Sequence, residues 1–292
     1  MRKIAVINQK GGVGKTTTVV NVAAALASSG SRVAVIDMDP QSHLTIHLGV
    51  EPSSVEQGSY EILTASAKFR DVLMPVRENL WLIGANINLV GAESELVSVV
   101  GREAILREAF KSAGDDIDYI FIDCPPSLGL LTLNSLVAAD EVFIPVQPHF
   151  LALQGFGKLL ETISLVNERI NHKLKVSTIL LCMFESRASL PNEVKADIEQ
   201  FLADARGQGL PWSDAVLMPV SIRRNIKLAE APSYGKTIFE YDASCNGAAD
   251  YLRVAEAMTG KLLRAAPSAA LPHQNTEEAA VKDAPKSSVQ NE

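Results

Sequence analysis

Short apolar runs, often β-branched, alternate with longer stretches of helical character along most of the chain. Such runs predict strands at residues 3–8, 32–37, 80–84, 118–123, 141–146, 175–182 and 215–218. They are apolar at successive positions, as in parallel strands that are covered on both faces. Helices are predicted between them, notably at 15–29, 93–113, 151–170 and 190–205. The alternation predicts an α/β fold, with a mostly parallel twisted sheet flanked by helices on both faces.

The apolar periodicity stops at about residue 265. The composition shifts there to Ala, Pro and Ser, and then to Asn, Gln, Glu, Lys and Ser. A segment of this kind buries too little apolar surface to offset the entropy of ordering it. We therefore expect one domain over residues 1–264 and a disordered C-terminal tail over 265–292.

The composition of the chain limits the classes of protein to which it can belong. The 292 residues, 47% of them hydrophobic, suffice for one large α/β domain, and no apolar stretch is long enough to span a bilayer. The N-terminus lacks the layout of a signal peptide, so we expect a cytoplasmic protein. Cys124, Cys182 and Cys245 are widely spaced and odd in number, which indicates reduced thiols. A net charge of −7 argues against dedicated high-affinity binding of nucleic acid but leaves room for a local basic patch.

A glycine- and lysine-rich loop follows the first predicted strand. Residues 9–18 read Gln-Lys-Gly-Gly-Val-Gly-Lys-Thr-Thr-Thr and lead into the first predicted helix. Strand, glycine-rich loop and helix N-terminus together form an anion site, because the backbone N–H groups and the helix dipole favour phosphate. The predicted nucleotide contacts are Gly11, Gly12, Val13, Gly14, Lys15, Thr16 and Thr17. The standard phosphate loop has glycine at position 9, whereas this chain has Gln9 followed by a second lysine, Lys10.

Two carboxylates follow the second predicted strand. Asp37 and Asp39 stand two residues apart, so their side chains project to the same side of an extended segment. Beside a nucleotide they suit the chemistry of Mg²⁺ and its bound waters, and an attacking water needs an oriented acceptor. The alternative is that both residues only cap the next turn.

A third acidic position ends the run Tyr119-Ile-Phe-Ile. Asp123 is followed by Cys124 and by Pro125-Pro126, which stiffen the turn. An apolar strand that ends in Asp is typical of the Walker B element. The carboxylate can hold Mg²⁺ through water beside the hydroxyl of Thr16.

A basic spot lies near the C-terminal end of the predicted domain. Arg223, Arg224 and Lys227 fall within five residues of an otherwise acidic chain. Cations of this kind can contact the phosphates of DNA without reading sequence. The alternative is an ordinary solvated charge run.

The four elements, in this order, resemble the ParA/MinD family of ATPases, and most closely the small ParA type. The stretch 10–17 resembles the family's deviant Walker A motif, and Asp123-Cys-Pro-Pro resembles its Walker B turn. Residues 222–236 resemble the segment Pro-Arg-Asn-Val-Arg-Leu-Ser-Glu-Ala-Pro-Ser, with Arg223 where the family usually has proline. The resemblance covers residues 2 to about 255.

The resemblance implies an ATPase that uses Mg²⁺. It assigns the β- and γ-phosphates to Lys15 and the loop amides, and the orientation of the attacking water to Asp39. It implies that Lys10 reaches across a dimer interface into the partner's site, so that ATP joins two subunits and hydrolysis parts them. The implied metal-site residues are Thr16, Asp37 and Asp123.

The resemblance also implies partners. We expect an ATP-dependent homodimer that binds nucleoid DNA non-specifically and segregates or positions plasmid DNA, chromosomal DNA or another cargo. A ParB-like or other adaptor protein would stimulate hydrolysis. The implied DNA contacts are Arg187, Arg223, Arg224 and Lys227. Met183 and the Met218-Pro219 pair are expected near the adenine ring.

Other classes share parts of this pattern. A MinD-like protein would bind membrane through a C-terminal amphipathic helix, but residues 253–264 contain Gly260 and only a short apolar face. We therefore interpret them as the last core helix and expect no stable membrane binding. Cys124 lies before two prolines rather than in a glycine-rich loop, which argues against an Fe–S cluster. A small-molecule kinase or ligase with the same phosphate loop remains open. No DNA-reading domain precedes the loop, so we do not expect binding to a specific operator.

Overall fold

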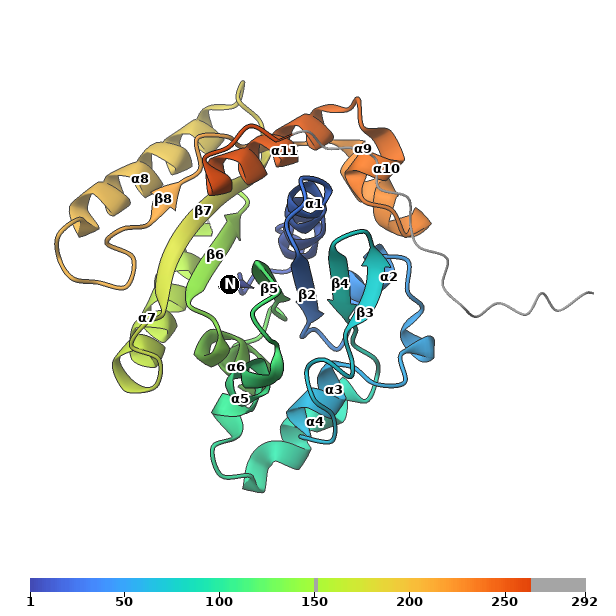
Figure 1. Ribbon diagram of the computed structural model, residues 1–292. Helices are drawn as coiled ribbons and strands as arrows, with labels where there is room; N and C mark the ends of the chain where they lie inside the picture. Colours follow the sequence, from blue (N-terminus) through green and yellow to red (C-terminus); the bar gives the residue numbers. More distant parts are fainter. Residues whose placement is uncertain (150–151, 264–292) are drawn as a thin grey trace, which may run out of the picture.

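The computed structural model describes residues 1–149 and 152–263, which form a sheet between two layers of helices (Figure 1). The strand order is β3-β4-β2-β5-β1-β6-β7-β8, and β9 pairs with β7. Neighbouring strands are parallel except β3 and β4, which are antiparallel. The strands are β1 Arg2–Val6, β2 Val33–Asp37, β3 Met74–Arg77, β4 Leu80–Ile83, β5 Tyr119–Asp123, β6 Glu141–Val146, β7 Lys175–Phe184, β8 Val216–Leu217 and β9 Ile222–Arg223. This architecture confirms the predicted fold class.

Two helical layers cover the two faces of the sheet. The α-helices are α1 Lys15–Ser28, α2 His43–His47, α3 Ser59–Leu63, α4 Leu89–Glu95, α5 Ile105–Ala109, α6 Leu130–Ala138, α7 Ala152–Arg169, α8 Ser189–Ala205, α9 Ile226–Glu230, α10 Ile238–Asp242 and α11 Asn246–Thr259. One hydrophobic cluster joins the sheet to α1, α2, α10 and α11, and the other joins it to α3 through α8.

The alternation of side chains along β1 shows how the sequence produces both layers. Ile4 and Val6 pack in the cluster on the α1 side, whereas Ala5 and Ile7 pack in the cluster on the opposite side. All four residues are fully buried. Successive strand residues point to opposite faces, so a strand covered on both sides must be apolar at every position.

The predicted helix over 93–113 is wrong as a single element. The structure has α4 there, then three-residue 3₁₀ turns at 96–98, 102–104 and 110–112, with α5 among them. Gly101 has a φ of 73°, in the left-handed region, and interrupts the chain just after the exposed Val99 and Val100. The strand β3 was not predicted. Pro75 lies within it, and β3 pairs with β4 alone; proline is tolerated on such edge strands.

The last core helix is confirmed, but α11 runs over Asn246–Thr259 and so both starts and ends earlier than the predicted 253–264. Within α11, Val254 and Ala255 are fully buried, and the helix packs on α1. Among the described residues, no helix combines the length and apolarity needed to cross a bilayer. The predicted tail over 265–292 lies outside the described residues, so its boundary and its disorder remain predictions.

Candidate nucleotide site

The sheet brings the three motifs to one edge. β1 lies next to β5, and β5 lies next to β2, so that Asp123 is paired in register with both Val6 and Asp37. The loop after β1 and the carboxylates at the ends of β2 and β5 therefore meet at the carboxyl ends of three adjacent parallel strands. Ligands of open α/β sheets bind at this edge.

The phosphate loop has the backbone shape that an anion site requires. Gly12 and Gly14 have φ values of 73° and 92°, which side chains other than glycine rarely adopt. Gly14 is the N-cap of α1, so the first N–H groups of this helix are available to an anion. Lys15 is only 8% exposed, and its Nζ lies 3.4 Å from the carbonyl oxygen of Lys10. The loop therefore curls around the position where phosphates would lie.

Thr16 and Asp123 form the centre of the site. The Thr16 hydroxyl donates a hydrogen bond of 2.6 Å to Asp123 Oδ2, while the buried Oδ1 has no partner among the described residues. Burial, followed by the charge of Asp37, raises the pKa of Asp123 to about 8. A cation beside this carboxylate would oppose both effects. Hydroxyl and carboxylate oxygens are ligands that Mg²⁺ accepts, so these two residues fit the predicted metal.

A metal held at this point would depend on few protein ligands. The described residues contain no group of three or more His, Cys, Asp or Glu side chains able to hold a metal ion. Mg²⁺ in nucleotide sites usually takes one or two protein ligands and completes its shell with phosphates and waters. The small donor set around Thr16 and Asp123 is consistent with that arrangement.

Asp37 is engaged in holding the turn that leads to α2. Its Oδ2 accepts hydrogen bonds from the Thr45 amide (2.9 Å) and the Thr45 hydroxyl (2.7 Å), and its Oδ1 accepts one from the Asp39 amide (3.1 Å). Burial raises the pKa of Asp37 to about 6 against these hydrogen bonds. The turn-capping alternative thus describes what Asp37 does here. Its place near the magnesium shell remains a prediction.

Asp39 is more accessible than Asp37. It is half-buried, and its Oδ1 accepts a hydrogen bond of 3.0 Å from the Gln41 amide. Oδ2 takes no hydrogen bond from the described residues and is open to a water. The side chain therefore combines a turn-capping oxygen with a second oxygen that is available for the predicted role.

Lys10 lies beside a residue that sequence reasoning missed. Its Nζ contacts Nε2 of His149 in the same subunit, and burial, followed by the charge of Lys10, lowers the pKa of His149. Asn8 donates a hydrogen bond of 2.7 Å to the carbonyl oxygen of Pro145. The position of His149 just after β6 was the available signal, because β6 is the neighbour of β1 in the sheet. The action of Lys10 in a partner's site remains a prediction.

The predicted DNA contacts lie close together, but acidic side chains partner most of them. Arg223 binds Asp250 at 2.6 Å, Arg224 binds Glu185 at 3.2 Å, and Lys227 binds Glu230 at 3.0 Å. Arg187 is exposed and lies two residues after Glu185 in the chain. The ion pairs are those expected of a solvated charge run, and DNA contact at this spot remains a prediction.

The two predicted adenine contacts have different surroundings. Met183 interrupts the pairing of β7 with β9 and has a φ of 53°, a conformation that costs free energy for a residue other than glycine. Met183 is half-buried and Pro219 is exposed, so both side chains are accessible. Met218 is buried in the core cluster on the α1 side. The adenine contact remains a prediction.

The sequence is similar to a family model and to partition proteins of several bacteria. A family model described as AAA domain matches residues 1–176. The sporulation initiation inhibitor protein Soj of Bacillus subtilis is 44% identical over 254 residues, which cover 87% of this chain and 96% of that protein. The chromosome partitioning protein ParA of Myxococcus xanthus is 42% identical over 252 residues, 86% of this chain and 85% of that protein.

A solved structure is also similar. The crystal structure of cobyrinic acid a,c-diamide synthase from Mycobacterium smegmatis, with bound ATP analogue and magnesium, is 34% identical in sequence and superposes with a TM-score of 0.73. The match covers 90% of this chain and 98% of that one. The similarity therefore extends well beyond the phosphate loop.

Proposed function

Because the chain belongs to the ParA/MinD family of P-loop ATPases, we propose that it hydrolyses ATP to ADP and phosphate as an ATP-induced homodimer. The cycle would segregate or position DNA or another cargo on the nucleoid, in the cytoplasm, with an adaptor protein stimulating hydrolysis. The observation that carries the proposal is the hydrogen bond between Thr16 and Asp123 at the mouth of the phosphate loop. Similarity to partition proteins over most of their length supports the cellular role.

The proposed nucleotide contacts follow from the shape of the loop. Lys15 and the loop amides would hold the β- and γ-phosphates, and Thr16 and Asp123 would hold Mg²⁺, with Asp37 close to its waters. The ion would supply positive charge that offsets the charge on the phosphates. The ATP analogue and magnesium bound by the related M. smegmatis protein support this assignment.

Hydrolysis would depend on positioning and charge rather than on covalent chemistry. Asp39 would accept a hydrogen bond from the attacking water and orient it. The partner subunit's Lys10 would neutralise charge that develops during the transfer. Lys10 is exposed in the single subunit, so its side chain can leave His149 and enter the active site of the second subunit without unfolding of the core.

DNA binding would be weak and tolerant of sequence. Arg223, Arg224 and Lys227 have acidic partners, so each phosphate must compete with an existing ion pair. Dimerisation would double the number of contacts, which is how ATP could switch binding on. A membrane-bound cycle of MinD type is less well supported, because α11 packs its apolar side on α1 within the described chain.

Turnover by purified protein with ATP and Mg²⁺ alone, without an acceptor substrate, tests the reaction and separates an ATPase from a ligase or kinase. Lys15→Ala removes the ammonium group that meets the phosphates, so nucleotide binding measured by calorimetry should be lost. Unchanged ATP affinity in this variant would contradict the assignment of the loop.

A mixing experiment tests the dimer. Lys10→Ala and Lys15→Ala subunits should each be inactive alone. In a mixed dimer, one site combines an intact Lys15 with the partner subunit's intact Lys10, so part of the activity should return. No recovery at any mixing ratio would show that Lys10 acts within its own subunit.

A further inference from the structure

A groove of about 560 Å³ lies on the helical layer formed by α4, α6 and α7. Apolar side chains from α6, from α7 and the residue that follows it, and from the loop before α6 line most of it. They are Leu128, Leu130, Leu133, Leu136, Leu165, Val166 and Ile170. Val97, which follows α4, completes the apolar wall. The volume lies in the range of sites that take up a substantial part of a ligand or a few side chains of a partner.

Apolar side chains next to the groove are unusually exposed. Val97 is 64% exposed, Leu165 is 49% exposed, and Val100, three residues after Val97, is 99% exposed. Single exposed apolar residues are common on proteins, but Val97 and Leu165 both line one apolar groove, which indicates a surface that another molecule covers.

The floor of the groove is connected to the nucleotide site through α6. This helix starts at Leu130, soon after Asp123, and Glu93 Oε1 accepts a hydrogen bond of 3.3 Å from the Leu131 amide. A Cβ on Gly129 would lie 2.2 Å from the same oxygen, so a side chain at this position would displace the Glu93 carboxylate from its present place. The loop between the Walker B strand and α6 is therefore held from the groove side. A molecule in the groove would contact the residues that set the position of this loop.

The charged side chains at the edge of the groove indicate which kind of partner would bind there. The charged residues that line it are Arg102, Arg169 and Glu93. The Glu93 carboxylate is directed at the N-terminus of α6, whereas both arginines are exposed. The edge thus presents two cations to solvent on a chain whose net charge is −7. An acidic group on the occupant would complement them.

We propose that this groove docks a short amphipathic helix of a partner protein, with an apolar side that enters the groove and carboxylates that meet Arg102 and Arg169. Docking would act on α6 and hence on the loop that carries the Walker B aspartate. The coupling to turnover rests on the proposed ATPase cycle, whereas docking itself does not. A second copy of this chain is the competing occupant.

The binding test uses a panel of labelled helical peptides of about 16 residues, roughly 24 Å long. Each peptide carries leucines along one side, with either Glu or Lys at the flanking positions, and scrambled versions serve as controls. Fluorescence anisotropy should show tighter binding of the Glu peptides than of the Lys or scrambled peptides. Equal binding of all three kinds, or binding of none in the panel, would overturn the proposal.

Variants then locate the site. Leu165→Lys should weaken binding of the Glu peptides at least about tenfold, a modest loss for a buried apolar contact. Leu190→Lys is the matched control, because Leu190 is 41% exposed on α8, outside the groove. Arg169→Glu should shift the preference towards the Lys peptides, and Arg206→Glu, on an exposed arginine outside the groove, should not. Identical effects of the groove and control variants would overturn the assignment.

Two further readouts separate this proposal from others. If Leu165→Lys abolishes self-association measured by light scattering, a second copy covers the groove and the partner proposal is wrong. ATP turnover is measured in parallel on the same samples. Peptide docking without any turnover in the wild type would support the groove and contradict the proposed function. ATP turnover without peptide docking would support the proposed function and contradict the proposed groove.

Discussion

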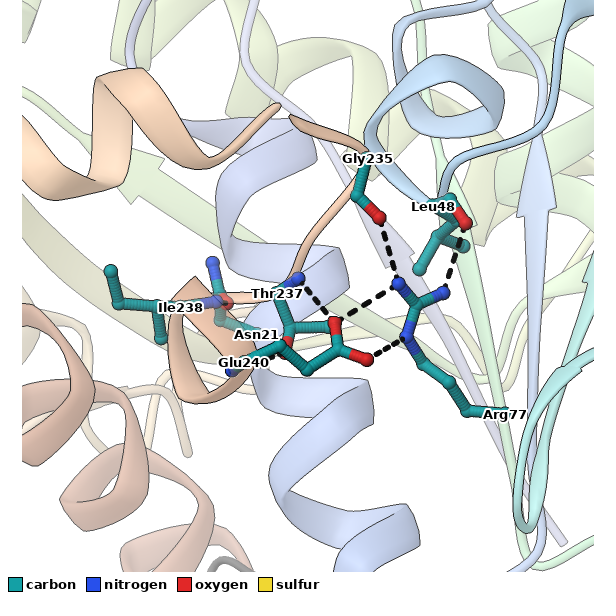
Figure 2. A network of polar contacts seen from close by, with 7 residues as sticks. All are labelled: Asn21, Leu48, Arg77, Gly235, Thr237, Ile238 and Glu240. Atoms are coloured by element: carbon teal, nitrogen blue, oxygen red, sulfur yellow. Dashed lines mark hydrogen bonds and ion pairs between the residues drawn. The ribbon is translucent and has the colours of Figure 1, made fainter. Parts of the chain in front are cut away.

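Arg77 and Glu240 form a buried, two-pronged ion pair that joins β3 to α10 (Figure 2). The Arg77 Nε and Nη2 atoms lie 2.9 and 3.0 Å from the two carboxylate oxygens. The same guanidinium donates to the carbonyl oxygens of Leu48 and Gly235, at 2.9 Å each, and Glu240 also accepts from the Thr237 amide. One buried cation thus holds together the end of α2, the turn at Gly235 and the start of α10.

Breaking this pair should be costly. Arg77→Met would leave the Glu240 carboxylate buried without its cation, which destabilises proteins by about 3–5 kcal/mol. Urea unfolding should show this loss, and the double variant Arg77→Met, Glu240→Leu should lose less than the sum of the single changes. Lys195→Met, which breaks the exposed pair with Glu199, is the control and should cost under about 1 kcal/mol. An equal cost for Arg77→Met and Lys195→Met would show that the buried pair contributes nothing special.

Asp39→Ala should separate nucleotide binding from hydrolysis. Asp39 would orient the water but need not hold the nucleotide, so ATP affinity should change little while turnover falls about 100-fold or more. Gel filtration with ATP should then show a persistent dimer. Asp71→Ala, at an exposed carboxylate away from the predicted site, is the control. A normal rate of hydrolysis in Asp39→Ala would assign the water to another acceptor.

DNA binding should require ATP and should weaken steeply with salt. Each phosphate that the protein neutralises adds about −0.9 to the log–log slope of affinity against salt. Arg224→Glu with Lys227→Glu should abolish binding to random-sequence duplex, measured by anisotropy, and leave the ATP-induced dimer intact. Lys68→Glu with Lys111→Glu is a charge-matched control at exposed positions.

Three results would contradict this account of the basic spot. Wild-type binding that is equally tight without nucleotide would separate DNA contact from dimerisation. Binding to a single operator sequence would contradict contact through phosphates alone. A charge-reversed dimer that still coats DNA would show that these cations form only a solvated face.

His47 should make the fold sensitive to acid. It is 2% exposed, its Nε2 has no partner among the described residues, and burial, followed by the charge of Arg77, lowers its pKa from 6.5 to about 3. Below pH 6.5 His47 is protonated in the unfolded chain but stays neutral in the folded chain. The free energy of unfolding therefore falls as pH falls towards 3. The loss approaches 1.4 kcal/mol per pH unit, or about 2–3 kcal/mol at about pH 4.5.

Urea unfolding of the wild type and of His47→Gln across this range isolates the histidine, because all carboxylates are common to both proteins. The variant should be less stable at neutral pH but should lose less stability on acidification. Parallel curves for the two proteins would show that His47 is protonated as readily in the folded chain as in the unfolded one.

The parts of the molecule that the sequence alone determined are local ones. Unbroken apolar runs at 4–7 and 119–122, inside the predicted strands 3–8 and 118–123, require cover on both faces, and the structure buries β1 and β5 between two helical layers. The predicted glycine-rich loop lies between β1 and α1, and its Gly12 and Gly14 adopt left-handed conformations. Local sequence patterns predict such features because the conformation of a strand, a turn or a phosphate loop depends on residues a few positions apart.

The tertiary structure decided what depends on residues far apart in the chain. It placed Thr16 against Asp123, engaged Asp37 with Thr45, set His149 beside Lys10, and broke the predicted helix over 93–113. Nothing in the sequence distinguishes Arg77 from other cations, but in the structure it is buried and joins three segments. The groove forms where α4, α6 and α7 pack together. Hydrogen-bond partners, desolvation and cavity shape arise only when segments pack, so no local pattern specifies them.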